Sequence, residues 1–426
     1  MSQLYNALLL AAKGAIDAGK HVPRIAPIGS KMRLFMKGQR AWRKNLVQQL
    51  PPANGRLTYW FHAASLGEFA VIRPVINQLT ATMNVRVVLT FFSSTGYEAL
   101  KRRTDIHNID YIGYLPLDTP GNVRRFLNAI EPDRAIFAIS EYWINYLREL
   151  RRRNIPTYLI SALITNHAPF FKWWGQPYRD ILKCYTRIAV LTEQSRKLLD
   201  KLGYHDAIVT GDPLFDNACV AAATPWRDEV IERFAGDGEL FIAGSISDEK
   251  DLALCVSVAR AHPELKCVFV PHEITSHHIT PIEAALPNAT IKRSQCTATT
   301  DFTGKQVLII DRIGELAYLY RYGTMAYIGG GFTPKLHSII EATVYGLPTS
   351  FGPEIHRKAT AQELIRLDIG TVVETTEQIN RWIDNLTGDQ KQLEQIKQKA
   401  CRYSEQNSGA TDKIVRLITS SPDQLS

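Results

Sequence analysis

The sequence lacks the cysteine pattern of a disulfide-bonded or zinc-binding protein. Its 426 residues contain six cysteines, and none of them forms a Cys-x-x-Cys pair or follows the spacing of zinc ligands. Scattered single cysteines behave as small hydrophobic residues and are typical of a reducing compartment. They are Cys184, Cys219, Cys255, Cys267, Cys296 and Cys401. The sequence therefore argues against a disulfide scaffold and a structural zinc site.

Common phosphate-binding motifs are also absent. There is no Gly-x-x-x-x-Gly-Lys-[Ser/Thr] and no Gly-x-Gly-x-x-Gly, which excludes a Walker-type loop and argues against a dinucleotide enzyme. No Asp-x-Asp pair is present to hold a divalent ion on a nucleotide diphosphate. In "PHEITSHH" (271–278), His272 and His277 are one residue too far apart for a zinc-protease helix. We therefore expect no metal site.

Acidic residues are nearly absent from residues 1–50, where nine Lys and Arg residues accompany only Asp17. The run "LYNALLLAAKGAIDAGKHV" is interrupted by Lys13 and Asp17, whereas a spanning helix needs about 20 predominantly apolar residues. The charges also do not precede the apolar run as in a signal peptide. We expect residues 1–50 to be a basic amphipathic segment on an anionic membrane surface. The alternatives are a basic helix packed on its own domain and a nucleic-acid patch, but aromatic-rich RNA-binding signatures are absent.

The rest of the chain alternates short β-rich runs with longer amphipathic runs. This alternation is typical of parallel sheets with helical crossovers, and the length favours two domains. Strands are expected at 56–62, 85–91, 134–139, 157–161, 186–190, 207–211, 240–245, 267–271, 306–310, 325–331, 347–352 and 371–374. The predicted fold class is α/β, with two doubly wound, Rossmann-like domains facing a cleft.

The expected domain boundaries follow from this pattern. Residues 51–210 and 211–395 are predicted to form the N-terminal and C-terminal domains, and residues 396–426 a helix that braces the N-terminal domain. Ligands of open parallel sheets bind beyond the carboxyl ends of the strands. Candidate site residues are therefore sought where each expected strand ends.

Three strand ends carry suitable side chains. In "HAASLGE" (62–68), Glu68 follows a glycine where a strand turns into a helix; a solvated surface acid is the alternative. The turn Ile313–Glu315 has free amides suited to an anion, although an ordinary helix start explains it equally well. After the glycines 329–331, Ser338 and Glu341 lie one helical turn apart, and the Glu341 carboxylate is suited to two ribose hydroxyls. The glycines themselves indicate either close approach of the backbone to another group or a plain turn.

These segments, taken in order, resemble one family, the 3-deoxy-D-manno-octulosonic acid (Kdo) transferases, which are glycosyltransferases with the GT-B fold. The resemblance covers nearly the whole chain after residue 35. Its motifs are "WFHAASLGE", "TFFSSTGYE", "YLPLDTPGNVRRFLN", "SEYWINYLREL", "FFKWWGQPYRDIL", "GDPLFDN", "PHEI", "DRIGEL", "YIGGG" and "HSIIEATVYGLPTSFGP". "FFKWWG" and "YIGGGF" are most similar to versions from Bacteroidetes-like bacteria.

The resemblance implies transfer of Kdo from CMP-Kdo to a lipid A precursor during lipopolysaccharide biosynthesis. It implies a peripheral or monotopic protein at the cytoplasmic face of the inner membrane of a Gram-negative bacterium, with no metal, no cofactor and no nucleic-acid partner. Glu68 matches the family's general base. The family's CMP-binding positions match Pro271, His272, Ile313, Gly314, Glu315, Ser338, Ile339, Ile340 and Glu341.

Four positions depart from the family pattern. Ile139 and Leu214 stand where the family usually has charged residues that stabilise the transition state, Thr165 replaces a common Arg, and Ser338 replaces an Asn. Losing such a stabiliser costs about 2.7–4 kcal/mol. Three hypotheses follow: a working Kdo transferase, a diverged GT-B enzyme with another donor or acceptor, and a catalytically weak paralogue that binds nucleotide or lipid. In the first, Arg152, Lys172 or Lys335 is expected to supply the missing charge.

Overall fold

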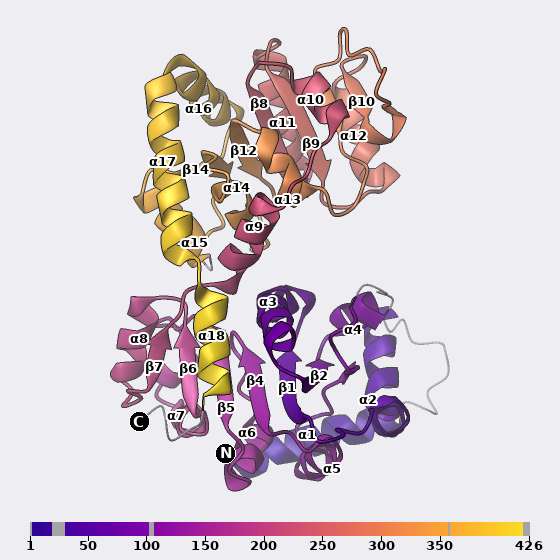
Figure 1. Cartoon of the computed structure of the whole chain (residues 1–426), viewed down its shortest axis with the longest axis vertical. Helices are drawn as coiled ribbons and strands as arrows, with labels where there is room; N and C mark the ends of the chain where they lie inside the picture. The colour runs from indigo at the N-terminus through magenta and orange to yellow at the C-terminus, as the bar shows by residue number, and fades with distance from the viewer. Residues whose placement is uncertain (1, 19–29, 102–105, 357, 421–426) are drawn as a thin grey trace. The chain divides into compact units, whose positions relative to one another are not determined.

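The structure of the chain is a computed structural model that describes residues 2–18, 30–101, 106–356 and 358–420. Its contacts form two compact units (Figure 1). Unit 1 comprises Met1–Asp216 and Gly409–Ser426, and unit 2 comprises Asn217–Ser408. The divisions differ from the expected boundaries at 210/211 and 395/396, and the first lies inside helix α9 (Pro213–Ala223).

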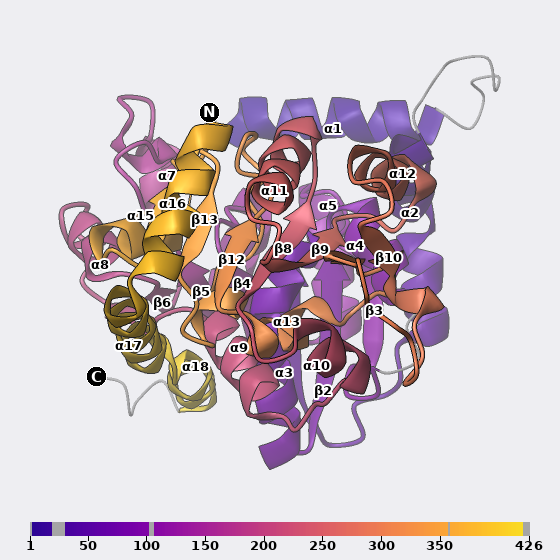
Figure 2. The ribbon, with the colours of Figure 1, turned by 90° about the horizontal axis from the view of Figure 1, so that it is seen from above.

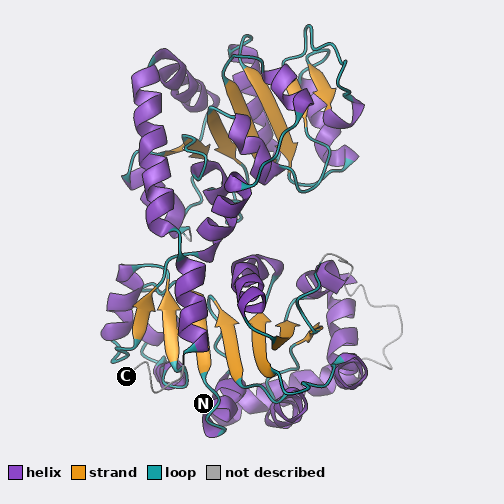
Figure 3. Cartoon of the chain, viewed as in Figure 1, coloured by secondary structure: helices purple, strands orange, loops and turns teal. Residues whose placement is uncertain are grey.

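Unit 1 contains a seven-stranded parallel sheet in the order β3-β2-β1-β4-β5-β6-β7 (Figure 3). Its strands are β1 (Leu57–Ala63), β2 (Val85–Phe91), β3 (Tyr111–Tyr114), β4 (Arg134–Ala138), β5 (Thr157–Ala162), β6 (Arg187–Val190) and β7 (Ala207–Val209). The order reverses direction between β1 and β4, which are paired in parallel, with His62 opposite Phe137. This reversal is the switch point at which doubly wound sheets bind ligands.

Helices cover both faces of the first sheet. One apolar core lies under α3 (Leu66–Thr82), α4 (Ser94–Lys101) and α18 (Ala410–Thr419). The other lies under α2 (Ser30–Gln49), α5 (Pro120–Ile130), α6 (Ile144–Arg152), α7 (Gln176–Leu182) and α8 (Glu193–Asp200). Figure 2 shows α3 and α18 on the side of the unit opposite to α5 and α7. Both faces of each central strand are therefore buried, which explains their continuous apolar sequences.

Unit 2 repeats the architecture with the order β10-β11-β9-β8-β12-β13-β14. Its strands are β8 (Leu240–Ile246), β9 (Lys266–Pro271), β10 (Thr290–Lys292), β11 (Val307–Ile309), β12 (Met325–Ile328), β13 (Thr349–Phe351) and β14 (Gly370–Val372). Its helices are α10 (Glu229–Ala235), α11 (Glu249–Ala261), α12 (Ser276–Ala285), α13 (Leu316–Leu319), α14 (Ile340–Thr343), α15 (Ala359–Arg366), α16 (Thr376–Gly388) and α17 (Gln390–Asn407). The switch point lies between β8 and β12.

The predicted α/β class with two doubly wound sheets is confirmed. All twelve expected strands are present, but β3 and β10 were missed. Both are edge strands of three or four residues, and β10 is only half-buried. Short edge strands carry weak apolar patterns because one side has no neighbour.

The basic N-terminal segment forms two helices, α1 (Ser2–Ala18) and α2. Residues 19–29 of the segment lie outside the described residues. The contacts assign both helices to unit 1: Gln39 of α2 donates to the carbonyl of Leu115 (2.8 Å), and Tyr5 of α1 donates to Asp118 (2.8 Å). Among the described residues, no helix is long and apolar enough to cross a membrane.

The expected C-terminal helix is divided into two. α17 ends at Asn407 in unit 2, and α18 begins at Ala410 in unit 1, where it packs on α3. The break occurs because Gly409 has a φ of +81°. The Asp216 carboxylate accepts hydrogen bonds from the amides of Gly409 and Thr411 (2.6 Å for Thr411) and so caps α18.

Helix α2 packs on β3 through Gly38, and this contact leaves no room for a side chain. A Cβ at Gly38 would lie 2.3 Å from the Tyr114 ring. We expect Gly38→Ala to lower the melting temperature, because overpacking a core contact costs about 1–3 kcal/mol. Gly14→Ala in α1 is the control, since a Cβ there meets nothing within 4 Å; it should leave the melting temperature unchanged or raise it. Equal effects of the two changes in calorimetry would contradict this packing.

Candidate active site

The switch point of unit 1 places two carboxylates at one edge of the sheet. Glu68 follows β1 and Glu141 follows β4, and these strands are neighbours. Both side chains therefore lie at the carboxyl edge, where the connections after β1 and β4 leave in opposite directions. This arrangement follows from strand order, because the two residues are far apart in the sequence.

Glu68 closes the N-terminus of α3. Ser65 is the N-cap residue, and its hydroxyl accepts a hydrogen bond from the Glu68 amide (3.4 Å). The Glu68 carboxylate in turn accepts a hydrogen bond from the Ala64 amide. A Ser-x-x-Glu sequence before a helix is a capping box, so helix capping alone explains a Glu at this position.

Capping does not explain the electrostatics of Glu68. Burial, followed by the Glu141 carboxylate, raises the pKa of Glu68 to about 7, although the Ala64 and Ser65 amides lower it. Glu68 is half-buried, so it is not a fully solvated surface acid. A carboxyl group with a pKa near neutrality accepts a proton efficiently at neutral pH. Glu68 therefore has the properties of a general base as well as of a cap.

Glu141 is buried, with 6% of its surface exposed. The indole nitrogen of Trp143 donates to its carboxylate, and the Tyr185 hydroxyl donates to its backbone carbonyl. The Nε2 atom of His62 lies 3.4 Å from the Glu141 carboxylate and has no hydrogen-bond partner among the residues that the structure describes. These contacts hold the Glu141 carboxylate in a fixed position.

The contacts of His62 place its imidazole ring between Thr90 and Glu141. Its Nδ1 atom lies 2.9 Å from the Thr90 hydroxyl and 3.1 Å from the Thr90 carbonyl oxygen. Its Nε2 atom faces the Glu141 carboxylate. His62, Glu141 and Glu68 thus form one polar cluster at the switch point of unit 1.

The backbone between β4 and Glu141 is strained. Ile139 has a φ of +65°, and the amide of Ser140 donates to the carbonyl of Ala138 (2.8 Å), which closes a tight turn around Ile139. A β-branched residue at positive φ is rare and costs about 1–3 kcal/mol. Such strain concentrates at functional sites, and here it sets the direction in which the chain leaves β4 toward Glu141.

The switch point of unit 2 brings together residues from three strand ends. The imidazole rings of His272, after β9, and His337, after β12, are 4.2 Å apart. The hydroxyl of Ser247, after β8, donates to the carbonyl of Ser245 (2.8 Å) and therefore accepts from His337 Nε2 (2.9 Å). Burial, His272 and Lys358 lower the pKa of His337 to about 4. His337 is thus neutral at pH 7, with Nδ1 as an acceptor.

The glycines after β12 are required by close packing. A Cβ at Gly329 would lie 2.1 Å from the carbonyl oxygen of Ser245, and Gly330 has a φ of +83°. The Asp251 carboxylate joins this loop to the end of β8, because it accepts from the amides of Gly330 (2.8 Å) and Ser247 (2.9 Å). The glycine run is therefore a close approach of the backbone to β8 rather than a plain turn.

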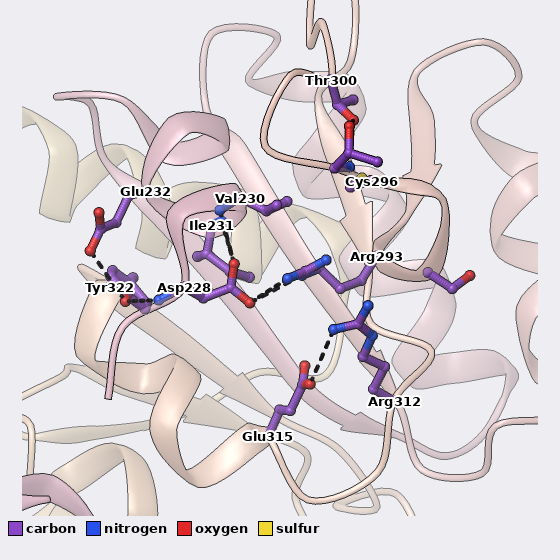
Figure 4. Close-up of polar contacts among 12 residues, drawn as sticks. Asp228, Val230, Ile231, Glu232, Arg293, Cys296, Thr300, Arg312, Glu315 and Tyr322 are labelled. Atoms are coloured by element: carbon purple, nitrogen blue, oxygen red, sulfur yellow. Dashed lines mark hydrogen bonds and ion pairs between the residues drawn. The ribbon is translucent and has the colours of Figure 1, made fainter. Parts of the chain in front are cut away.

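The turn after β11 lies beside a buried ion pair, as Figure 4 shows. Arg293 contacts Asp228 at 2.7 Å, and the two side chains are nearly buried. Arg312 lies 3.8 Å from Glu315, whose second carboxylate oxygen is buried and has no hydrogen-bond partner in the described part of the chain. Ile313 is 91% exposed, and Gly314 has a φ of +90°. Because α13 has only four residues, any anion binding here rests on local amides rather than on a helix dipole.

The segment Ser338–Glu341 differs in one detail from what the sequence predicted. Ser338 precedes α14 and is exposed, so Ser338 and Glu341 do not share a helical face as the spacing predicted. Pro271, Ile339 and Ile340 are buried, the first at the end of β9. Burial raises the pKa of Glu341, and the Glu341 charge contributes to the raised pKa of Tyr320.

Two of the positions that differ from the family pattern, Leu214 and Thr165, lie in different surroundings. Leu214 is half-buried in α9, and its amide donates to Asp212 (3.0 Å). Thr165 is exposed, and its carbonyl accepts from Ala168 (3.0 Å). Neither residue supplies a charge.

The three residues that were expected to replace the missing charge lie in different places. Arg152 is wrong for this role: it pairs with Glu149 at the far end of α6, about 12 Å along the helix from the strand-end edge. Lys172 is exposed beside Trp173. Lys335 lies in the glycine loop of unit 2, and its carbonyl packs against Gly330.

Glu141, His62, Ser247, His337 and Lys358 were not among the predicted site residues. Position at the end of a predicted strand was the available signal for Glu141 and Ser247. His62 is the last residue of the strand expected at 56–62 and so carried the same signal, whereas Lys358 follows no expected strand end directly. The contacts that these residues make are decided by the tertiary structure.

Comparison with known proteins agrees with this architecture. Residues 38–217 match the family described as 3-deoxy-D-manno-octulosonic-acid transferase (kdotransferase). Proteins named 3-deoxy-D-manno-octulosonic acid transferase include one from Rickettsia felis, 22% identical over 87% of this chain and 80% of the relative. Those from Haemophilus influenzae and Chlamydia pneumoniae are 24% and 25% identical, over 86% and 92% of this chain and 87% and 91% of the relatives.

Solved structures show the same fold. UDP-GlcNAc 2-epimerase from Neisseria meningitidis has a TM-score of 0.59 and 16% identity, over 85% of this chain and 98% of that chain. MurG from Acinetobacter baumannii has a TM-score of 0.55 and 14% identity, over 85% and 99%. The chain thus has the two-domain GT-B fold. By sequence, its residues 38–217 match the Kdo transferase family, and the chain is similar over most of its length to proteins named Kdo transferases.

The effect of the Glu141 carboxylate on the pKa of Glu68 should be measurable. We expect Glu141→Gln to lower the pKa of Glu68 from about 7, because it removes a negative charge while burial remains. Carbon-13 NMR of labelled Glu carboxyl groups, with Glu68→Gln for assignment, measures this shift. Glu149→Gln is the control, since Glu149 pairs with Arg152 and Arg153 instead. An unchanged Glu68 titration in Glu141→Gln would show that the two carboxylates do not interact.

Proposed function

We propose that this protein transfers Kdo from CMP-Kdo to a hydroxyl group of a lipid A precursor. The observation that carries the proposal is the half-buried carboxyl group of Glu68, whose pKa is raised to about 7 beside Glu141 at the switch point of unit 1. Its position matches the general base of the family to which the chain is similar. The same family expectation supplies CMP-Kdo as donor, the lipid acceptor, and a location at the inner membrane.

The reaction then follows from the chemistry of the groups. Glu68 takes the proton of the acceptor hydroxyl as its oxygen forms a bond to the anomeric carbon of Kdo. The bond between that carbon and the phosphate oxygen breaks, and CMP leaves with the electron pair. Because the donor already carries a phosphate leaving group, the proposal includes no metal. Burial and the Glu141 carboxylate hold the pKa of Glu68 at about 7, where the carboxyl group both accepts and releases a proton.

The nucleotide is proposed to bind at the strand ends of unit 2. Pro271 and His272, the turn Ile313–Glu315 and the segment Ser338–Glu341 are the proposed positions. The neutral His337 supports this assignment, because it offers an acceptor beside His272 without adding charge. The Lys358 ammonium group close to His337 supplies positive charge for the phosphate.

The departures at Ile139 and Leu214 favour one alternative, a GT-B enzyme with another donor or acceptor. An isoleucine at the strained turn supplies no charge to stabilise a transition state. An assay with CMP-Kdo and a lipid A precursor distinguishes the proposed Kdo transferase from this alternative, because an enzyme with another donor or acceptor forms no product from these two substrates. A nucleotide-binding paralogue without activity would bind CMP but form no product with any donor.

Removal of the proposed base should abolish transfer. We expect Glu68→Gln to reduce the rate of Kdo transfer about 10²–10⁴-fold, while Glu149→Gln leaves it unchanged. Because the carboxylate is the active form, the wild-type rate should rise as the pH rises through about 7. Transfer is measured as radiolabelled Kdo in the lipid product. Wild-type activity in Glu68→Gln would overturn the assignment of the base.

The turn at Gly314 should affect nucleotide binding through its backbone. Gly314 and Gly304 both have positive φ and open space around a Cβ, so alanine strains the two positions in the same way. We expect Gly314→Ala to weaken CMP binding about tenfold through displaced amides, and Gly304→Ala to leave it unchanged. Calorimetric titration with CMP measures both. Equal affinities of the two variants would exclude the turn from the nucleotide site, and no binding by the wild type would exclude a CMP-Kdo donor.

A further inference from the structure

Three aromatic side chains form a row at the carboxyl edge of the first sheet. Phe35 of α2 contacts Phe92, which follows β2, with ring centres 5.1 Å apart. Phe92 in turn contacts Trp143, which precedes α6, with ring centres 4.9 Å apart. All three side chains are only half-buried, so each ring keeps surface that the protein does not cover. Phe35, Phe92 and Trp143 are called the aromatic row below.

Two contacts place the aromatic row next to Glu68. The indole nitrogen of Trp143 donates to the Glu141 carboxylate, and Glu141 is close enough to Glu68 to raise its pKa. The loops after β1 and β2 are also joined, because the Ser93 amide donates to the Ala64 carbonyl (2.8 Å). The Ala64 amide donates to the Glu68 carboxylate. The aromatic row and Glu68 therefore lie on adjoining loops of unit 1.

The rest of the fold holds the rings in place. Trp143 packs edge-on against the buried His62, with ring centres 5.9 Å apart and an angle of 75° between the planes. The loop that carries Phe92 is fixed to α2, because the Ser94 hydroxyl donates to the Lys31 carbonyl (3.1 Å). A surface that is already ordered binds a ligand without the entropic cost of ordering it first. The aromatic row is therefore preformed for binding.

Polar groups border the aromatic row and indicate what it binds. The hydroxyls of Ser93 and Thr95 are 3.3 Å apart on the loop after β2, and Thr95 is exposed. An acyl chain would cover these hydroxyls and the Glu68 carboxylate without offering a hydrogen bond, which costs free energy. A sugar ring has apolar C–H groups on its faces and hydroxyl groups around its edge. It therefore matches both the rings and the polar groups beside them.

We propose that the aromatic row binds the sugar ring that bears the acceptor hydroxyl. One face of the sugar packs on Phe92 and Trp143, because the electron-rich face of an aromatic ring attracts C–H groups that carry partial positive charge. The hydroxyl at the edge of the sugar is then directed to Glu68, since a general base needs direct contact with the proton that it takes. This inference rests on the proposed function, because it assigns the acceptor of that reaction to named side chains.

The proposal is tested first at Phe92, by the kinetics of transfer to the lipid acceptor. We expect Phe92→Leu to raise the KM for the acceptor about fivefold, because leucine is apolar but has no aromatic face. The KM for CMP-Kdo should not change, and Phe92→Tyr, which keeps the ring, should restore the KM for the acceptor. An unchanged KM for the acceptor in Phe92→Leu, or equal losses in Phe92→Leu and Phe92→Tyr, would overturn the proposal.

Phe302→Leu in unit 2 is the matched control. Phe302 is also half-buried and contacts Phe234, with ring centres 5.4 Å apart. This variant makes the same chemical change far from β2 in the sequence, and it should transfer Kdo with the wild-type KM for the acceptor. An equal rise of that KM in Phe302→Leu and Phe92→Leu would show a general loss of packing and would contradict the assignment of the aromatic row.

Direct binding distinguishes the sugar of the acceptor from its acyl chains. Calorimetric titration uses the sugar head group of the acceptor, prepared without acyl chains. We expect the wild type to bind it, and Phe92→Leu and Trp143→Leu to bind it about fivefold more weakly. Trp143→Phe keeps a ring but loses the N–H group that contacts Glu141, so it should restore the affinity. If the wild type does not bind the head group, or if both leucine variants bind it equally well, the aromatic row does not bind the sugar.

Loss of folding is recognised from the melting temperature of each variant. If one of the two leucine variants is unfolded, the other carries the test, because Phe92 and Trp143 lie on different loops. A rise in the KM for the complete lipid without weaker binding of the head group would assign the aromatic row to the acyl chains instead.

The aromatic row and the proposed reaction are tested independently of each other. Glu68→Gln should still bind the sugar head group but should lose transfer. Head-group binding that depends on Phe92, without any transfer from CMP-Kdo by the wild type, would retain the sugar site and remove the proposed reaction. Transfer with a wild-type KM for the acceptor in both leucine variants would retain the reaction and remove the sugar site.

Discussion

The organisation of the site depends on the order of strands in the first sheet. Because β1 and β4 are neighbours, the connections that follow them leave the same edge in opposite directions, and each carries one carboxyl group. Glu141 is held by Trp143 and faces His62, and its charge adds to the burial that raises the pKa of Glu68. Two acids that cannot both ionise freely in a buried place make one of them a proton acceptor near neutral pH. The strained turn at Ile139 places the second acid there.

Unit 2 has the same topology but different groups at its switch point. Its central strand ends carry neutral or donor groups: the Ser247 hydroxyl, a neutral His337, and backbone brought close by Gly329 and Gly330. Asp251 is tied to this backbone and is not free to oppose an anion. The two switch points therefore differ in charge, because that of unit 1 carries two carboxyl groups and that of unit 2 carries a hydroxyl group, a neutral imidazole and backbone amides.

Sequence patterns predicted most of the fold, because central parallel strands are apolar throughout and the intervening helices are amphipathic. They missed β3 and β10, which lie at sheet edges where few contacts are made. They identified Glu68 through its place at a strand end and through family resemblance. They assigned no role to Glu141, because its partner His62 lies 79 positions earlier in the chain. Arg152 was a wrong choice for a replacement charge, since the length of α6 removes it from the edge.

The sequence by itself determined the α/β class, the two sheets, the basic N-terminus and the candidate strand ends, since these depend on local patterns and composition. Tertiary structure alone decided that the pKa of a helix-capping glutamate is raised, because burial and a second carboxylate are supplied by distant segments. It also decided that α1 turns its polar side inward and its apolar side outward. An amphipathic pattern states only that a helix has two faces, and the contacts of the folded chain determine which face is covered.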